Sequence, residues 1–472
     1  MNKKALGFIK NFSYVLTSNF ISLLIATLII LIIPKVIGVE EYGYWQLYLF
    51  YSTYLGFLHF GWNDGIYLRY GGEQYSNLNK PLFFSQFYML IILQIIMASL
   101  LIIYSVFFSS DDNRVFIGQM LALGLLLINP RFMLLYILQG TNRIKEYAQI
   151  TMLDKILYSL LIIAFLLFGA KDFKIMVLAD VIGKFISLSY AMFCCREIVF
   201  RNISTFYFSF KETIHNINTG IKLMFTNIAS MLIIGVVRFG IERSWDVTAF
   251  GKISLTLSIS NLMMLFINAI GIVIFPILRR TKEEKLANIY ITIRDFLMVV
   301  LLGGLVIYFP LKGILSIWLP QYADSLIYMA LLFPICVYEG KMALLINTYL
   351  KTLRKEKLML VINLISLSLS VLLTVVSIEI WQSLNLTVLS IVILLAFRCI
   401  FAEKLLSNIL QVSVNKDTIL ELGMTTIFIL VGWFIEPALG ISLYFVAYLF
   451  YLILKKNDIL LSFKNLKILI KK

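Results

Sequence analysis

Several charged side chains interrupt long apolar stretches of this sequence, where together they could bind an anionic group. Arg131 and Lys341 are 210 residues apart, which matches the offset of an internal repeat described below. An ionisable residue inside a membrane is unfavourable by about 2.5–3.5 kcal/mol on insertion scales and indicates a polar path by default. With Arg398 as a third cation, the pair suits a diphosphate, because arginine offers a bidentate fork and lysine a point charge. The alternative is that each cation reaches back to the membrane surface.

Three further ionisable residues could couple movement of a ligand to an ion gradient. Asp180 and Lys184 are four residues apart, so on a helix they could simply neutralise each other, and this interpretation is favoured over a proton relay. Glu339 and Lys341 point about 200° apart on a helical wheel, so at least one of them needs a partner on another helix. Glu339 is therefore the better candidate for ion coupling.

Polar side chains recur at one depth of two apolar stretches. Asn19 and Ser22 in the first stretch match Asn227 and Ser230 in the seventh when the sequence is shifted by 208 residues. The duplication predicts a polar stripe that would hydrogen-bond sugar hydroxyls in a shared lumen. Hydrogen bonding between helices is the alternative.

Composition and motifs exclude several classes of function. Hydrophobic residues make up 60% of the 472 residues and charged residues only 14%, which excludes a soluble protein. Two histidines and four cysteines, none in a CxxC spacing, provide no metal centre and indicate no cofactor. There is no P-loop and no large soluble loop for a catalytic domain, so the chain is not expected to be an enzyme. The net charge of +15 is spread over short connections, which favours anionic lipid and argues against nucleic acid as a partner.

The elements that must position these residues are membrane-spanning helices. A span needs about 20 mostly apolar residues. Cations are concentrated in the loops that would face the cytoplasm if the N-terminus does, so the positive-inside rule predicts both termini in the cytoplasm. The sequence predicts an all-α membrane protein with fourteen spans, at approximately 12–33, 44–61, 82–108, 115–138, 150–168, 175–193, 221–237, 253–275, 289–309, 325–346, 358–378, 386–402, 418–434 and 440–454.

An internal repeat divides these spans into two lobes. VEEYG at 39–43 aligns with VTAFG at 247–251 at the same offset as the polar stripe, and TNRIKE at 141–146 aligns with TLRKEK at 352–357. Six spans separate the copies, so both run in the same direction, as in transporters whose two halves move against each other. We expect an N-lobe at 1–201, a cytoplasmic amphipathic linker at 202–219, a C-lobe at 220–411, and two further helices with a basic cytoplasmic tail at 412–472.

These features together resemble a known family. Two six-helix lobes, a G-x-x-x-Y-G loop at 38–43, the QGTNR run at 139–143 and two extra C-terminal helices are similar to Wzx-type polysaccharide flippases of the multidrug/oligosaccharidyl-lipid/polysaccharide (MOP) exporter superfamily. The resemblance implies movement of an undecaprenyl-diphosphate-linked oligosaccharide, of O-antigen or capsule type, from the inner to the outer leaflet of the bacterial cytoplasmic membrane. Without a P-loop, we expect alternating access to be driven by an ion gradient or by the substrate gradient. Membrane lipids, a polysaccharide polymerase and a chain-length regulator are the expected partners.

Two other functions compete with this one. A multidrug or cation antiporter of the same superfamily should display acidic residues to its cationic drugs, whereas the residues here are largely cationic. A membrane-embedded O-antigen polymerase or ligase is a different class of protein, and it should carry a large external loop that the short connections do not provide.

Overall fold

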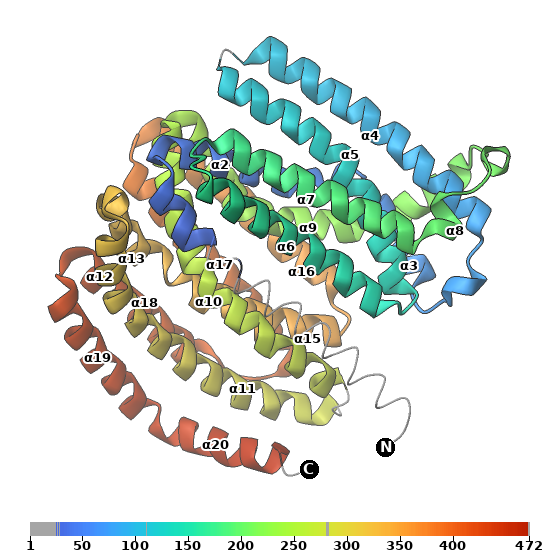
Figure 1. Ribbon diagram of the computed structural model, residues 1–472. Coiled ribbons are helices and arrows are strands. Elements are labelled where there is room, and N and C mark those ends of the chain that lie inside the picture. Colours follow the sequence, from blue (N-terminus) through green and yellow to red (C-terminus); the bar gives the residue numbers. More distant parts are fainter. Residues whose placement is uncertain (1–24, 26, 28, 110, 280–282, 471–472) are drawn as a thin grey trace. The chain divides into compact units, whose positions relative to one another are not determined.

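The computed structural model describes residues 25, 27, 29–109, 111–279 and 283–470, and within these ranges it consists of helices and turns (Figure 1). The chain divides into two compact units, with unit 1 ending at Ile228 and unit 2 beginning at Ala229. The boundary lies inside helix α9, which therefore contributes to both units. The described helices that begin in unit 1 are α2 (Val39–Leu55), α3 (Trp62–Tyr70), η1 (Tyr75–Asn77), α4 (Lys80–Phe108), α5 (Asp112–Gly140), α6 (Ile144–Leu167), α7 (Phe173–Cys194), α8 (Arg196–Val199), η2 (Ile203–Thr205) and α9 (Phe210–Ser244).

Helices α4 and α5 of unit 1 begin at polar caps. Asn79 accepts a hydrogen bond from the Leu82 amide at the start of α4, and Asp111 accepts one from the Asn113 amide at the start of α5. Such side chains satisfy amide groups that have no partner within the helix. At about 1.5 Å per residue, the 29 residues in each of these helices are more than enough to cross a bilayer core of about 30 Å.

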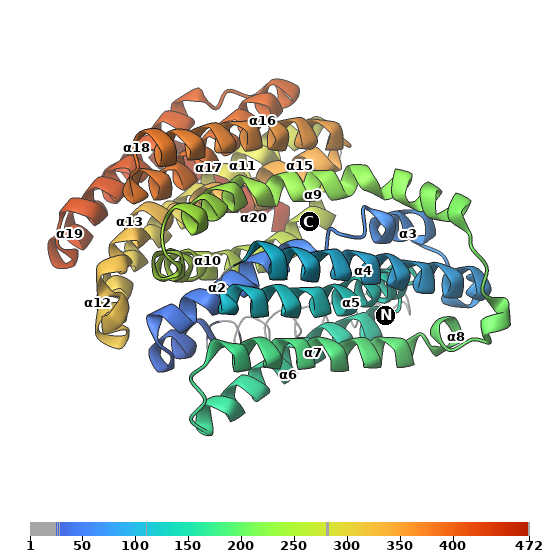
Figure 2. The same ribbon diagram turned by 90° about the horizontal axis from the view of Figure 1, so that it is seen from above.

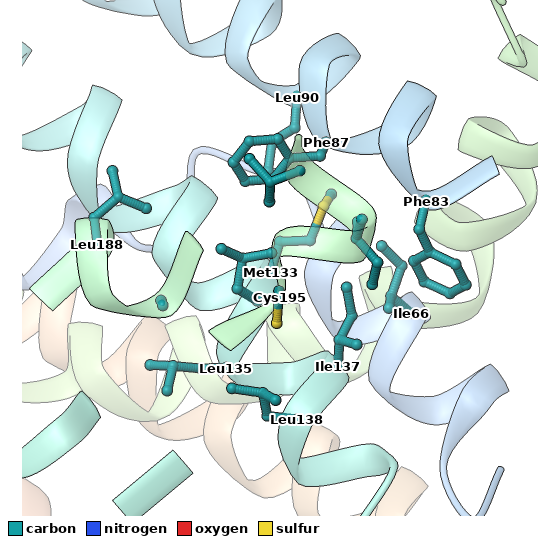
Figure 3. Packing of buried hydrophobic residues seen from close by; sticks show 14 of the residues in the cluster. Ile66, Phe83, Phe87, Leu90, Met133, Leu135, Ile137, Leu138, Leu188 and Cys195 are labelled. Carbon is teal, nitrogen blue, oxygen red and sulfur yellow. The ribbon is translucent and has the colours of Figure 1, made fainter. Parts of the chain in front are cut away.

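The core of unit 1 lies between α3, α4, α5 and the end of α7 (Figure 3). Phe83 and Phe87 of α4 pack with Met133 and Ile137 of α5, and Cys195 closes the cluster just after α7. Figures 1 and 2 both show α4 beside α5 and α6 beside α7. Because one face of α5 packs in this apolar cluster, the orientation of its polar residues about the helix axis is fixed.

Unit 2 is built around the helical run from Pro320 to Thr352, which is largely buried. The described helices that begin in unit 2 are α10 (Val247–Arg279), α11 (Glu283–Gly304), η3 (Leu305–Ile307), α12 (Tyr308–Trp318), η4 (Pro320–Ile327), α13 (Tyr328–Leu332), α14 (Ile335–Lys341), η5 (Met342–Ile346), α15 (Asn347–Thr352), α16 (Glu356–Val375), η6 (Val376–Ile380), α17 (Leu384–Leu410), α18 (Asn415–Phe434), α19 (Pro437–Leu454) and α20 (Lys456–Ile470). The η5 segment is a π-helical turn directly after Lys341, a distortion that is frequent at functional sites.

Eleven helices in the described part of the chain are long and apolar enough to cross a membrane, which identifies a multi-pass membrane protein. Each of these eleven overlaps one expected span. Of the other three expected spans, 12–33 lies mostly outside the described residues, 44–61 overlaps the 17-residue α2, and 253–275 lies within α10. The total of fourteen spans and the side of the membrane on which the termini lie remain predictions.

Three local features differ from the sequence-based expectation. Helix α2 begins at Val39, so the G-x-x-x-Y-G run is mostly helical. The same helix ends at Leu55, and the rest of the second expected span is a turn in which Gly61 has a φ of 84°. The expected linker at 202–219 is not a separate element, because its second half is the beginning of α9. The expected tail after 454 contains helix α20, in which Ser462 is buried.

A glycine contact holds α3 against α9 inside unit 1. A Cβ atom added at Gly65 would lie 1.8 Å from the backbone oxygen of Asn216, and one added at Gly220 would lie 2.1 Å from the backbone oxygen of Gly61. Only glycine allows two backbones to approach this closely.

We therefore expect Gly65→Ala to lower the free energy of unfolding by about 1–3 kcal/mol or more, because the two backbones must separate. Thermal unfolding of the detergent-purified protein measures the change. Gly313→Ala is the matched control, since its Cβ would meet nothing within 4 Å. An unchanged unfolding midpoint for Gly65→Ala would contradict the contact.

Candidate functional site

Arg131 lies in α5 with its guanidinium buried in unit 1. The residue follows Pro130, which lies inside the continuous helix, and is 5% exposed. Its Nη2 is 3.0 Å from Oδ2 of Asp154 in α6, and its Nε has no hydrogen-bond partner in the described part of the chain. Asp154 is partly accessible, and the neighbouring Lys155 is exposed. This buried cation thus has an unused donor and an accessible counterion.

Tyrosine rings lie to one side of this ion pair, beginning with Tyr147. Tyr147 lies close enough to Arg131 and Tyr67 to interact with both electrostatically. The rings of Tyr67 and Tyr136 are 5.5 Å apart between centroids. Binding sites for small ligands combine apolar and aromatic walls with a few oriented polar groups, and this cluster has that composition.

The QGTNR run ends α5 and joins it to its neighbours. The hydroxyl of Thr141 donates to the Ile137 carbonyl, and Arg143 bonds to Glu146 and donates to the Cys194 carbonyl. Burial lowers the pKa of Arg143, but the hydrogen bond and the charge of Glu146 outweigh it, so the pKa is raised. The run therefore fixes α5 and α6 relative to the end of α7.

Asp180 and Lys184 form the ion pair that their spacing predicts. The Lys184 ammonium contacts the Asp180 carboxylate, and the Tyr48 hydroxyl donates to the same carboxylate over 2.6 Å. This geometry fits the interpretation that the two residues neutralise each other. A proton relay through these residues remains untested.

Arg398 joins four helices of unit 2. Its guanidinium donates to Glu339 of α14 over 2.8 Å, to Asn363 of α16 over 3.1 Å and to Ser230 of α9 over 2.8 Å. The carboxylate of Glu339 is 25% exposed, whereas Arg398 is 4% exposed. Glu339 thus has its partner on another helix, as the helical wheel requires.

Lys341 is buried among carboxylates. It is 1% exposed, and its Nζ contacts Glu403 of α17 and Glu421 of α18, the latter at 2.6 Å. Arg294 of α11 contacts the same two carboxylates at 2.7 Å each and Asp417 at 2.9 Å. The geometry therefore does not support Lys341 as the counterpart of Arg131 in binding a diphosphate. Two carboxylates already neutralise its charge.

The same network reaches the C-terminal helices. Lys455, at the end of α19, contacts Asp295 at 3.0 Å, Asp417 at 2.7 Å and Asp458 at 2.9 Å. Burial lowers the pKa of Lys455, but hydrogen bonds to the three carboxylates outweigh this and raise it. Lys455 stays charged and connects α11, α18 and α20.

The expected polar stripe is only partly visible. Asn19 and Ser22 lie outside the described residues. Asn227 is exposed on α9, while the Ser230 hydroxyl accepts a hydrogen bond from Arg398. Ser230 therefore has a partner within its own unit, and contact with sugar remains a prediction.

Sequence reasoning missed several residues of these clusters. Asp154 and Arg294 both interrupt expected spans, and a stricter search for charges inside apolar stretches would have found them. Glu403 and Glu421 were missed because each lies near the end of an expected span, where charged residues are common. Within the described ranges, no group of three or more His, Cys, Asp or Glu side chains is arranged to hold a metal ion.

Known structures place this fold among membrane transporters. The lipid II flippase MurJ in an inward closed conformation matches 95% of this chain and 99% of its own, with a TM-score of 0.66 and 13% identity. An inward-facing multidrug resistance MATE family transporter of the MOP superfamily matches 82% of this chain and 96% of its own, with a TM-score of 0.58 and 10% identity. A MATE structure in the bent conformation matches 84% and 94%, with a TM-score of 0.54 and 13% identity.

The chain therefore shares its fold with the lipid II flippase MurJ and with MATE transporters, one of which is described as a member of the MOP superfamily. No family model and no curated protein matches the sequence.

Proposed function

We propose that this protein is a flippase of the MOP superfamily that moves an undecaprenyl-diphosphate-linked oligosaccharide across the bacterial cytoplasmic membrane. It carries its substrate from the inner to the outer leaflet by alternating access and makes or breaks no covalent bond. Two compact units and a fold shared with the lipid II flippase MurJ support this mechanism. A polysaccharide polymerase would consume the product, with a chain-length regulator as a further partner.

Arg131 is the observation that carries this proposal. A buried guanidinium with an unpaired Nε and tyrosine rings nearby suits a phosphate group attached to a sugar. Hydrogen bonds from a charged donor to phosphate oxygens are among the strongest that a protein makes. Arg398 of unit 2 is proposed as a phosphate contact in its own right, because its carboxylate partner Glu339 is partly accessible.

The fold alone fits a multidrug transporter equally well. A cationic drug would have to displace Arg131 from Asp154 and meet a positive charge, which is electrostatically unfavourable. The acidic residues of unit 2 that could attract a cation are largely paired with Arg294, Lys341 and Lys455. The residues therefore favour an anionic substrate.

The function can be tested with the full-length protein in proteoliposomes. We expect a fluorescent undecaprenyl-diphosphate oligosaccharide to become accessible to a reducing quencher on the opposite side, and a cationic dye to remain untransported. Uptake of the dye without movement of the lipid would establish the multidrug alternative. Extension of the oligosaccharide would establish a polymerase.

Coupling to an ion gradient is proposed to act through Glu339. Protonation would release Glu339 from Arg398 and leave that guanidinium with a free donor for the substrate. Glu339→Gln should therefore retain lipid movement down a concentration gradient but lose its dependence on a proton gradient. If wild type and variant respond identically to the gradient, Glu339 is not the coupling residue.

A further inference from the structure

Unit 1 contains a pocket, lined by both charged and apolar side chains, that the proposed transport does not use. The pocket has a volume of about 620 Å³ and lies where the end of α3 and the beginnings of α4 and α9 meet. Figure 2 shows the first part of α9 running past α3. The lining residues are Arg69, Leu82, Tyr207, Ser209, Lys211, Glu212, Ile214, His215 and Asn218. The predicted topology places this region at the cytoplasmic surface of the membrane.

The charges of the pocket leave one positive charge unmatched. Arg69 contacts Glu212 at 2.7 Å, and the Tyr70 hydroxyl donates to the same carboxylate over 2.8 Å. The Lys211 ammonium is exposed and forms no ion pair within the described ranges. His215 lies one turn further along α9, and the start of this helix adds partial positive charge. The pocket therefore suits an anion that carries a single negative charge.

The walls of the pocket are held in place by internal contacts. The Gln86 side chain accepts a hydrogen bond from the Trp62 indole over 2.7 Å and donates to the Ser209 hydroxyl over 2.6 Å. The contact between Gly65 and the Asn216 backbone fixes α3 against α9 at the same level. Because these groups are already ordered, binding of a ligand needs little rearrangement.

Exposed apolar side chains neighbour the pocket's lining residues along the chain. Phe208 and Phe210 are 63% and 61% exposed, and their rings stack with centroids 5.6 Å apart. Ile203 and Ile214 are also exposed. Apolar side chains beside cations are typical of segments that lie in the membrane interface.

We propose that this pocket binds the phosphodiester headgroup of an anionic phospholipid such as phosphatidylglycerol, with its acyl chains against Phe208, Phe210 and Ile214. The headgroup contacts Lys211 and His215, while Arg69 and Glu212 pair with each other and keep the pocket wall in position. A phosphodiester carries one negative charge and so matches the single unpaired cation. A diphosphate carries more charge than the pocket can neutralise. This site lies within unit 1 and does not depend on the transported substrate.

Native mass spectrometry of the full-length protein in a neutral detergent tests the proposal. The wild type should retain phosphatidylglycerol in preference to phosphatidylcholine, and the variant Lys211→Gln with His215→Gln should weaken phosphatidylglycerol binding about fivefold or more. Lys357→Gln, which removes an exposed lysine elsewhere, is the matched control and should bind like the wild type. Equal retention by the double variant and the control would overturn the proposal.

A second arm of the experiment separates a lipid from a free phosphate compound. Glycerophosphoglycerol, the soluble headgroup, should bind much more weakly than the intact lipid, and Phe208→Ser with Phe210→Ser should weaken lipid binding without affecting the soluble headgroup. Equal binding of the headgroup and the lipid would assign the pocket to a soluble phosphodiester and overturn the lipid proposal. Size-exclusion chromatography establishes that each variant is folded.

Discussion

Replacing Lys341 with methionine is expected to lower the free energy of unfolding by about 3–5 kcal/mol. Lys341 is fully enclosed, and its ammonium lies between the carboxylates of Glu403 and Glu421. Without it, Arg294 alone must neutralise both carboxylates. An uncompensated charge in a low-dielectric interior is strongly unfavourable, so thermal unfolding of the purified protein should shift to a clearly lower temperature.

A second substitution shows whether charge balance is the cause. Lys341→Met combined with Glu421→Gln removes one charge of each sign and should recover part of the lost stability. Lys404→Met is the matched control, because Lys404 follows Glu403 but is exposed, and within the described residues its ammonium donates only to Asn415. Even an exposed ion pair contributes about 1 kcal/mol or less. If Lys341→Met unfolds like the control but abolishes transport, Lys341 is a substrate ligand after all.

The ion pairs around Lys341 illustrate which parts of the structure could be predicted from the sequence and which could not. Apolar stretches of membrane-spanning length identify the spans, because a helix in lipid must be apolar over a fixed length. The same reasoning predicts that Glu339 or Lys341 needs a partner on another helix. It cannot name the partner, since Glu403 and Glu421 lie 62 and 80 residues further along the chain. Only the packing of α14 against α17 and α18 determines which carboxylate neutralises which cation.

The internal repeat was also a limited guide to the candidate site. It correctly drew attention to Arg131 and Lys341, both of which are buried charges. Equal spacing does not give equal surroundings, however. Arg131 has one partly accessible partner from the next helix, whereas Lys341 is enclosed by carboxylates. One of these carboxylates comes from α18, which lies outside the repeat, so the comparison of the two lobes could not have revealed it.

The sequence also failed to predict the turn between α2 and α3, and the reason is different. The stretch at 44–61 is apolar enough for one span, and hydropathy does not register a break in a helix. The break arises where Phe60 and Gly61 adopt positive φ angles of 54° and 84°. It lets α3 approach α9 closely, so the local backbone geometry follows from a contact with a segment about 155 residues away.

Replacing Arg131 with alanine is expected to reduce movement of the lipid-linked oligosaccharide about ten- to hundredfold. This range corresponds to about 1.5–3 kcal/mol for hydrogen bonds that involve a charged group. Arg131→Lys should be intermediate, because lysine keeps the charge but loses the bidentate geometry. The assay is the quencher-accessibility measurement in proteoliposomes that contain equal amounts of folded protein. Arg196→Ala, which removes an exposed arginine of the same unit, should have no effect.

A structural role for Arg131 makes a different prediction in the double variant. Arg131→Ala leaves Asp154 without its ion-pair partner, and this alone could reduce activity by destabilising unit 1. Arg131→Ala with Asp154→Asn removes both charges, so stability should largely return. If Arg131 binds the diphosphate, transport stays low in this stable variant, because no guanidinium remains for the phosphate oxygens. Recovery of transport together with stability would show that the ion pair only supports the fold, and the assignment of Arg131 to the substrate would be wrong.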